Sequence, residues 1–195
     1  MLIRGLFIRT QQTPNPLFLQ FFPGVPLIKE GSLDFPAVRY AQKYPLAQKL
    51  FQIEGISHIF LTKDYISVGR AETVDWSIIK PLVFEVLMSH ISSGQEVYEV
   101  EPSEDTKILD SDSADLALLK EIIDLRIRPF VRDDGGDVRL VSFDESTGEV
   151  LLEMRGSCSG CPSSAITLKI GMEKMIKHYI KTVTEVKAID EVKSN

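Results

Sequence analysis

Few cysteines, no long apolar run and no surplus of basic residues characterise this 195-residue sequence. Cys158 and Cys161 alone cannot form the disulfide framework of a small secreted domain, so we expect a reducing interior. The apolar segment 78–91 is interrupted by charged residues and a proline, and it falls short of the roughly 20 apolar residues that cross a bilayer. The net charge of −6 does not favour nucleic-acid phosphates. We therefore predict a protein that binds neither membranes nor nucleic acids.

The sequence also lacks the residue patterns of common enzymes and of targeting segments. No Ser–His–Asp set, glycine-rich phosphate loop or HExxH motif is recognisable, so we predict that the protein is not an enzyme. The apolar segment 2–9 is too short for a secretory signal and lacks the length and composition of a transit peptide. On this basis the bacterial cytoplasm is slightly favoured over the mitochondrial matrix, where a processed form would lie.

Acidic residues crowd one segment between two globular parts. Hydrophobic residues make up 44% of the chain and charged residues 26%, which is typical of a folded protein, and the length suffices for two small domains. Between Gly94 and Ser113 seven acidic residues face a single lysine, Lys107, and like charges keep such a segment extended. We predict an α+β protein of two small domains, 1–94 and 114–195, joined by a flexible acidic linker, 95–113.

Local patterns predict the elements of each domain. In the N-terminal domain we expect short strands at 7–10 and 17–22, a helix at 46–53, a hairpin of strands 56–61 and 65–68, and a helix from Trp76 to His90. The C-terminal domain reads as α-β-β-α-β. Its elements are a helix with apolar residues from Leu116 to Phe130, kinked near Pro129, a hairpin of 138–143 and 150–154, a helix that begins at Pro162, and a strand at 183–189.

The two cysteines form a CxxC motif that suits a metal centre. Ser159 and Gly160 let the backbone turn, so that both sulfurs reach one metal. Cys161 precedes a predicted helix, whose N-terminal dipole lowers the pKa of a thiol and so favours the thiolate that binds metals. We therefore predict Cys158 and Cys161 as the metal- and cofactor-binding residues.

Ligand counting indicates that the site is shared. An iron–sulfur cluster takes about four protein thiolates, and this chain has two. His178 lies 17 residues beyond Cys161 on the same predicted helix, about 25 Å away at about 1.5 Å per residue. The economical completion is the same CxxC of a second copy across a two-fold axis. A dithiol redox pair and a zinc ion held by two copies remain as alternatives.

Four motifs accompany each other in the C-terminal domain: Arg126-Ile-Arg-Pro129, Asp133-Asp-Gly-Gly-Asp-Val138, Gly156-Ser-Cys-Ser-Gly-Cys-Pro-Ser-Ser164 and Thr167-Leu-Lys169. With these residues the domain closely resembles the Nfu family of NifU C-terminal-domain-like iron–sulfur scaffolds. The upstream segments Phe7-Ile8, Thr13-Pro-Asn-Pro16, Phe22-Pro-Gly24 and Phe51-Gln-Ile-Glu-Gly55 look like the N-terminal domain that such proteins have in mitochondria and in some bacteria. The resemblance covers nearly the whole chain.

The resemblance implies a function. It implies a scaffold or late-acting carrier that binds a [4Fe–4S] cluster between the CxxC motifs of a homodimer, with Cys158 and Cys161 as ligands. Such a carrier works between upstream cluster-assembly proteins and apo-proteins such as lipoyl synthase, to which it delivers the cluster.

Some charged residues near these motifs have plainer interpretations. Asp133, Asp134 and Asp137 could bind a hard metal ion, but the glycines between them more often mark a helix end and a turn, and we predict the turn. Arg155 and Lys169 either guide an anionic cluster or are ordinary solvated charges. The three histidines receive no role.

Overall fold

The computed structural model describes residues 7–94, 98, 104–159 and 162–190, and for 162–168 and 190 it describes the backbone alone. The chain consists of two compact units, Met1–Pro102 and Ser103–Asn195. Each unit contains strands and helices, so the predicted two-domain α+β class is confirmed.

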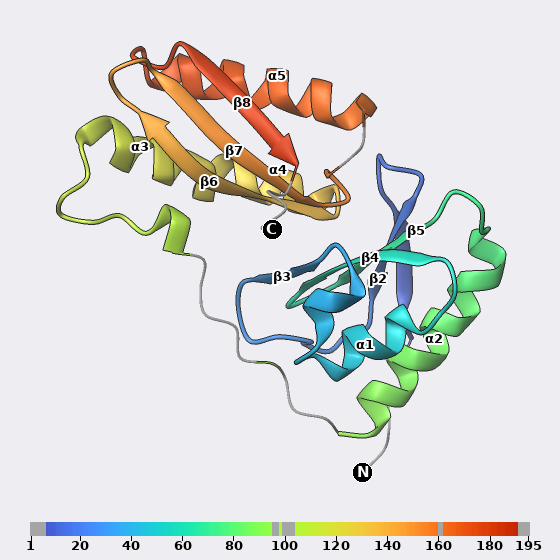
Figure 1. The fold of residues 1–195 in the computed structure, drawn as a ribbon. Helices are drawn as coiled ribbons and strands as arrows, with labels where there is room; N and C mark the ends of the chain where they lie inside the picture. The colour runs from blue at the N-terminus through green and yellow to red at the C-terminus, as the bar shows by residue number, and fades with distance from the viewer. Residues whose placement is uncertain (1–6, 95–97, 99–103, 160–161, 191–195) are drawn as a thin grey trace. The chain divides into compact units, whose positions relative to one another are not determined.

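The N-terminal unit is built on a five-stranded antiparallel sheet (Figure 1). Its strands are β1 (Arg9–Gln12), β2 (Phe18–Phe22), β3 (Ser32–Phe35), β4 (Ile56–Thr62) and β5 (Ile66–Arg70), in the spatial order β1-β2-β5-β4-β3. Three helical segments complete the unit: the 3-10 turn η1 (Val38–Ala41), α1 (Pro45–Phe51) and α2 (Trp76–Ser92). The predicted strands and helices are present, and β3 is an addition that sequence patterns did not indicate.

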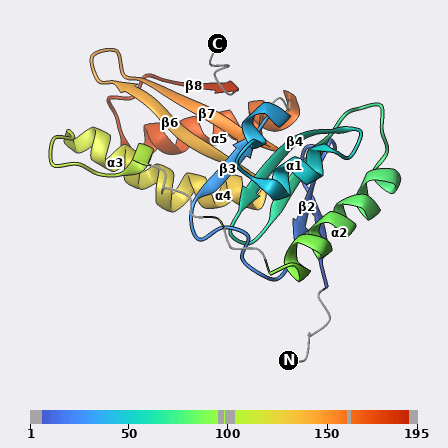
Figure 2. The ribbon, with the colours of Figure 1, turned by 60° about the horizontal axis from the view of Figure 1, so that its bottom comes forward.

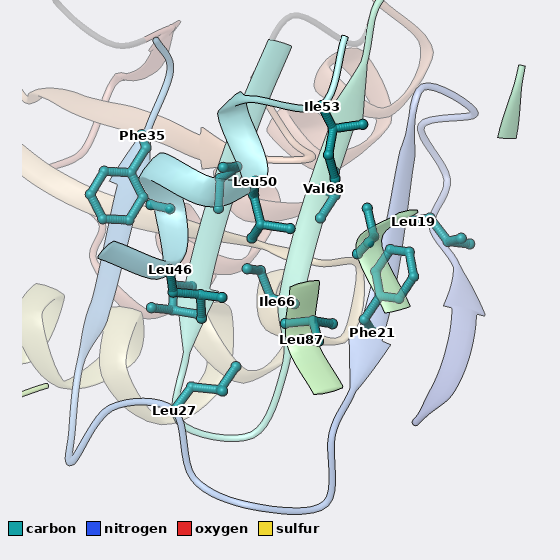
Figure 3. Close-up of a cluster of buried hydrophobic side chains, with 14 of the residues drawn as sticks. Leu19, Phe21, Leu27, Phe35, Leu46, Leu50, Ile53, Ile66, Val68 and Leu87 are labelled. Carbon is teal, nitrogen blue, oxygen red and sulfur yellow. The ribbon is translucent and has the colours of Figure 1, made fainter. Parts of the chain in front are cut away.

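The core of this unit lies between the sheet and the two α-helices. Strand side chains such as Phe21, Ile66 and Val68 alternate toward this core, where they meet Leu50 of α1 and Leu87 of α2 (Figure 3). Phe21, Leu50, Ile66, Val68 and Leu87 are fully buried. Burial of such side chains contributes roughly 1.5–3 kcal/mol each, which makes this cluster the main source of the unit's stability.

The Thr13-Pro-Asn-Pro16 motif shapes the turn between β1 and β2. The Asn15 side-chain oxygen accepts the Leu17 N–H (3.1 Å), and the Thr13 hydroxyl donates to the Asn15 carbonyl oxygen (2.7 Å). Asn15 is buried, with 5% of its surface exposed. Such side-chain bonds to the local backbone are a common way of fixing a turn, and they account for the motif without a partner.

The C-terminal unit has the predicted α-β-β-α-β order. It contains α3 (Ala114–Ile122), a π-helical turn η3 (Ile123–Ile127), α4 (Arg128–Asp133), β6 (Gly136–Asp144), β7 (Glu149–Gly156), α5 (Pro162–Tyr179) and β8 (Glu185–Asp190). Strands β6 and β7 pair antiparallel and β8 pairs parallel to β7, so the three strands lie side by side (Figure 2). Their inward residues share one apolar core with α3, η3, α4 and α5.

The predicted kink near Pro129 takes the form of the π-helical turn. Proline has no N–H for a helical hydrogen bond, and its ring collides with the carbonyl group four residues earlier, here that of Leu125. A widened turn just before the proline avoids this collision, which is a common origin of π-helical turns. The helical chain from Ala114 to Asp133 is therefore continuous, with a widened turn at 123–127.

The second half of the predicted linker is ordered on the C-terminal unit. A 3-10 turn, η2 (Glu104–Thr106), precedes α3, and the Asp105 carboxylate forms an ion pair with Arg128 (2.9 Å) and accepts the Leu140 N–H (2.9 Å). The sequence predicted an extended segment because its many acidic residues repel one another. The structure differs because buried basic side chains neutralise these acids. Of the remaining linker, only Tyr98 lies within the described residues, and its hydroxyl accepts the Leu46 N–H (3.0 Å) in the N-terminal unit.

Candidate functional site

Strand β7 leads directly into the cysteine motif. Gly156 ends the strand with a φ of 62°, a conformation that suits glycine, and the Ser159 N–H donates to its carbonyl oxygen (3.1 Å). Cys158 follows in this turn and is buried, with 2% of its surface exposed. Cys161, the second predicted ligand, lies outside the described residues, so the pairing of the two thiols stays a prediction. Helix α5 begins one residue after Cys161, at Pro162.

The Cys158 thiol packs against the first residue of β6. A Cβ atom added to Gly136 would lie 2.7 Å from Cys158 Sγ and 2.5 Å from the Arg155 carbonyl oxygen. Both distances are shorter than van der Waals contact allows. Because the interior is closely packed, it has no room for the extra methyl group. Only glycine therefore fits at position 136 while Cys158 keeps this position.

The segment before Gly136 also holds the cysteine turn through its backbone. The Asp134 carbonyl oxygen accepts the Ser157 hydroxyl, and the Gly135 carbonyl oxygen accepts the Ser157 N–H (3.3 Å). Gly135 has a φ of 86°, which ends α4 and directs the chain into β6. The Asp-Asp-Gly-Gly motif thus forms one side of the turn that carries Cys158.

The acidic residues of this motif do not gather into a metal site. Within the described ranges, no group of three or more His, Cys, Asp or Glu side chains is placed to hold a metal ion. Asp137 instead pairs with Arg128 (3.1 Å) and Arg132 (3.2 Å). Burial, and secondly the carboxylate of Asp133, raise the pKa of Asp134. The turn that sequence patterns favoured at this position is therefore what the structure contains.

A buried arginine connects the separate motifs of the unit. Arg128 is 6% exposed, and its guanidinium donates to Asp137 (3.1 Å), to Asp105 (2.9 Å) and to the Val138 carbonyl oxygen (3.2 Å). Further bonds reach Thr106 (3.0 Å) and Asp124. A buried arginine is tolerated only when its charge and its donors are satisfied, as they are here. The motif Arg126-Ile-Arg-Pro129 contains this residue, but its burial was not predicted, because arginines are exposed by default.

Arg155 and Lys169 differ in what the structure shows of them. The Arg155 Nε donates to the Glu153 carboxylate (3.2 Å), which also lies within 3.6 Å of Arg139. Because side chains alternate along a strand, Arg155 points to the opposite face of β7 from Met154, which is in the core. Arg155 is thus engaged in an ion pair on the outer face of the sheet, whereas Lys169 is half-buried on α5.

Across the described residues no helix combines the length and the apolar character that a bilayer crossing requires.

Fold and site define a class: a protein of two α+β units in which the second presents a buried CxxC cysteine after an antiparallel hairpin. Models of two families match the chain, the Nfu/NifU N-terminal scaffold-protein family over residues 8–94 and the NifU-like domain family over residues 119–187. The chain belongs to the Nfu family of NifU-like proteins, as the sequence motifs predicted.

Curated relatives agree over nearly the whole chain. NifU-like protein 4, mitochondrial, of Arabidopsis thaliana is 44% identical over 96% of this chain and 66% of its own length. A NifU-like protein of Schizosaccharomyces pombe is 46% identical over 94% of this chain and 73% of its own length. The mitochondrial NFU1 iron-sulfur cluster scaffold homolog of Drosophila persimilis is 44% identical over 95% and 66%, respectively. The chain thus spans about two thirds of the length of the relatives it matches.

These relatives correct one prediction. The sequence slightly favoured a bacterial cytoplasm, because no transit peptide was recognisable. Relatives from a plant and from Drosophila are named mitochondrial, so the bacterial preference has no support. The start of the chain was uninformative about compartment.

Proposed function

We propose that this chain is an iron–sulfur cluster scaffold and carrier that binds its cargo through Cys158 and Cys161. One observation carries the proposal: a chain that belongs to the Nfu family holds Cys158 in a turn built by that family's own motifs, against Gly136. A relative that matches 95% of the chain is named an iron-sulfur cluster scaffold homolog. The role is that of a carrier and not of an enzyme.

The cargo we propose is a [4Fe–4S] cluster shared by two chains. Each chain has two cysteines, and the cluster takes four thiolates, so a homodimer supplies one complete set. The cluster supplies the anionic iron–sulfide core that apo-proteins need. This chain's residues present the thiolates, and the N-terminus of α5, which begins next to Cys161, favours their deprotonation.

Delivery requires partners at both ends of the transfer. We propose upstream cluster-assembly proteins as donors and apo iron–sulfur proteins such as lipoyl synthase as recipients, in the mitochondrial matrix. The short segment between Tyr98 and Glu104 joins the two units, and such a tether raises the effective concentration of the cluster-bearing unit near a recipient bound to the other.

The test is anaerobic reconstitution of the whole chain with iron and sulfide. We expect a brown protein with a broad absorption band near about 400 nm, since thiolate ligation of iron produces charge-transfer bands. Cys158→Ser and Cys161→Ser should each abolish the band. Ser142→Ala, an exposed substitution on β6, is the control and should retain it.

Two results would assign the motif to other chemistry. A colourless monomer that retains only zinc would contradict cluster binding. Steady reduction of insulin disulfides by the monomer, lost on either cysteine substitution, would identify a dithiol redox protein instead.

A further inference from the structure

The C-terminal unit has a surface groove far from its cysteines. It has a volume of about 290 Å³ and is lined by Leu118, Glu121, Ile122, Leu125, Arg126 and Tyr179. Tyr179 is the last residue of α5, whereas Cys161 precedes the first, so the groove and the cysteine motif lie at opposite ends of a helix about 27 Å long at about 1.5 Å per residue. The groove is therefore separate from the cluster site.

Apolar side chains line this groove and remain accessible to solvent. Leu118, Ile122 and Leu125 recur at the spacing of one helix face, and Ile122 is buried as the floor. Leu125 is 68% exposed and Tyr179 44% exposed. Large apolar side chains that cluster at a concave surface are typical of interaction sites, whereas scattered ones are not.

The π-helical turn explains why Leu125 projects. Pro129 forces the widened turn at Ile123–Ile127, and Leu125 lies at its centre. Leu125 is therefore exposed at the point where the helical chain is widened. Tyr179 borders the groove from another element, so the groove exists only where α5 ends beside the π-helical turn.

Two charged side chains of opposite sign, Glu121 and Arg126, border the groove. The Arg126 guanidinium lies over the Tyr179 ring, 5.3 Å from its centroid, which holds the cation in place. Glu121 lies on α3, one residue before Ile122. Among the described residues neither Arg126 nor Glu121 takes part in an ion pair. An occupant with a carboxylate for Arg126 and a basic group for Glu121 would satisfy both charges.

We propose that this groove binds an amphipathic helix of a partner protein, whose apolar ridge is bordered by a carboxylate on one side and a basic residue on the other. A helix fits because apolar ridges spaced three and four residues apart pack into such grooves. The opposite charges fix its direction. Binding there leaves the cysteine end of α5 uncovered, so a partner can hold the carrier while the cluster site stays accessible. The groove itself does not depend on the proposed cluster chemistry.

Peptide binding to the cluster-free full chain tests this surface directly. Two synthetic 18-residue helices share a leucine ridge and carry Glu and Lys either in the matching order or exchanged. Amide chemical shifts should move around Leu118, Leu125 and Tyr179 on addition of the matching peptide, with weaker binding of the exchanged one. The double variant Glu121→Arg with Arg126→Glu should reverse that preference.

Substitution of Leu125 provides the second arm. Leu125→Asp should weaken binding of the matching peptide about tenfold or more, because the apolar contact is lost. Ile108→Asp, at a side chain 55% exposed outside the groove, should bind like the unaltered chain. Circular dichroism of both variants should be unchanged.

The proposal is overturned by equal binding of the two peptides, by undiminished binding to Leu125→Asp, or by shifts located elsewhere. Shifts in the groove that depend on protein concentration alone would identify a second copy of the chain as the occupant and also overturn it. None of these outcomes bears on cluster binding, which is measured separately.

Discussion

Gly136 and Cys158 occupy adjoining space: a single methyl group on the α-carbon of Gly136 would lie 2.7 Å from the Cys158 sulfur. The two residues belong to different motifs, 22 positions apart. The contact explains why β6 begins with a second glycine, Gly136, although Gly135 alone suffices to end α4. The glycine-rich turn and the cysteine turn are two parts of one structure.

We predict that Gly136→Ala destabilises the C-terminal unit and disturbs the cysteine turn. The added methyl group must displace either the thiol or the Arg155 carbonyl group, and such overpacking typically costs about 1–3 kcal/mol. Urea unfolding should show this loss, and thiol-reactive reagents should modify Cys158 faster than in the unaltered chain.

Gly171→Ala is the matched control. An added Cβ there meets nothing within 4 Å, and alanine in an exposed helix is more favourable than glycine by roughly 0.5–1 kcal/mol. The control should therefore be at least as stable as the unaltered chain. Equal stability and equal thiol reactivity of Gly136→Ala and the unaltered chain would refute the packing argument.

We predict that Asp105→Ala destabilises the C-terminal unit although position 105 falls in the acidic segment. The substitution removes one carboxylate from the buried Arg128 and leaves the Leu140 N–H without its acceptor, at a cost of about 1–3 kcal/mol. The unfolding transition should be followed by the NMR signals of the β6 amides.

An exposed ion pair in the same turn supplies the comparison. Glu104 and Lys107 lie 3.7 Å apart with most of both side chains in solvent, so Glu104→Ala should change stability by less than about 0.5 kcal/mol. If the two variants unfold at the same urea concentration, the segment 104–113 does not stabilise the unit.

Changes to the connection between the units should alter transfer without altering stability. A flexible insertion between Glu101 and Pro102 lengthens the tether and lowers the effective concentration of one unit near the other, so cluster transfer should slow modestly. The free energy of unfolding of each unit should stay the same.

By contrast, deletion of residues 105–112 removes the contacts to Arg128 and Lys120 and should destabilise the C-terminal unit. Identical behaviour of the two changes would contradict the ordered placement of this segment.

Asp134 gives a pH dependence with a defined sign. Burial and Asp133 raise its folded-state pKa, so the folded protein holds a proton that the unfolded chain has already released. Stability is therefore lost as pH rises from the ordinary aspartate value near about 4 through the raised value. We predict that Asp134→Asn is more stable than the unaltered chain at pH 7 and equal to it below about pH 3.

Asp133→Asn should show part of the same gain, because the Asp133 carboxylate is the second cause of the raised pKa. Unfolding curves at a series of pH values would measure both effects. If the stability of Asp134→Asn and of the unaltered chain depends on pH in the same way, the charged Asp134 carboxylate does not destabilise the folded state.

Sequence patterns predicted elements whose signal is local. The hairpin of β6 and β7, the helix after Pro162 and the kink at Pro129 all follow from periodicity and proline chemistry. Strand β3 was missed because its four residues, Ser32–Phe35, form a short edge strand that depends on pairing with β4 rather than on its own pattern.

Long-range partners were beyond local patterns. The ion pair of Asp105 with Arg128 joins residues 23 positions apart, and the acidic composition around Asp105 suggested disorder. The contact of Gly136 with Cys158 likewise depends on how two turns meet. CxxC spacing indicated a metal or redox site, and only the surrounding motifs pointed to an iron–sulfur cluster.

The most direct test of the central claim is native mass spectrometry of the anaerobically reconstituted chain, combined with iron and sulfide analysis. The account predicts a species of two chains with four irons and four sulfides, and the loss of this species on Cys158→Ser or Cys161→Ser. A single chain that carries a metal ion, or a dimer that retains its irons with both cysteines replaced, would contradict it.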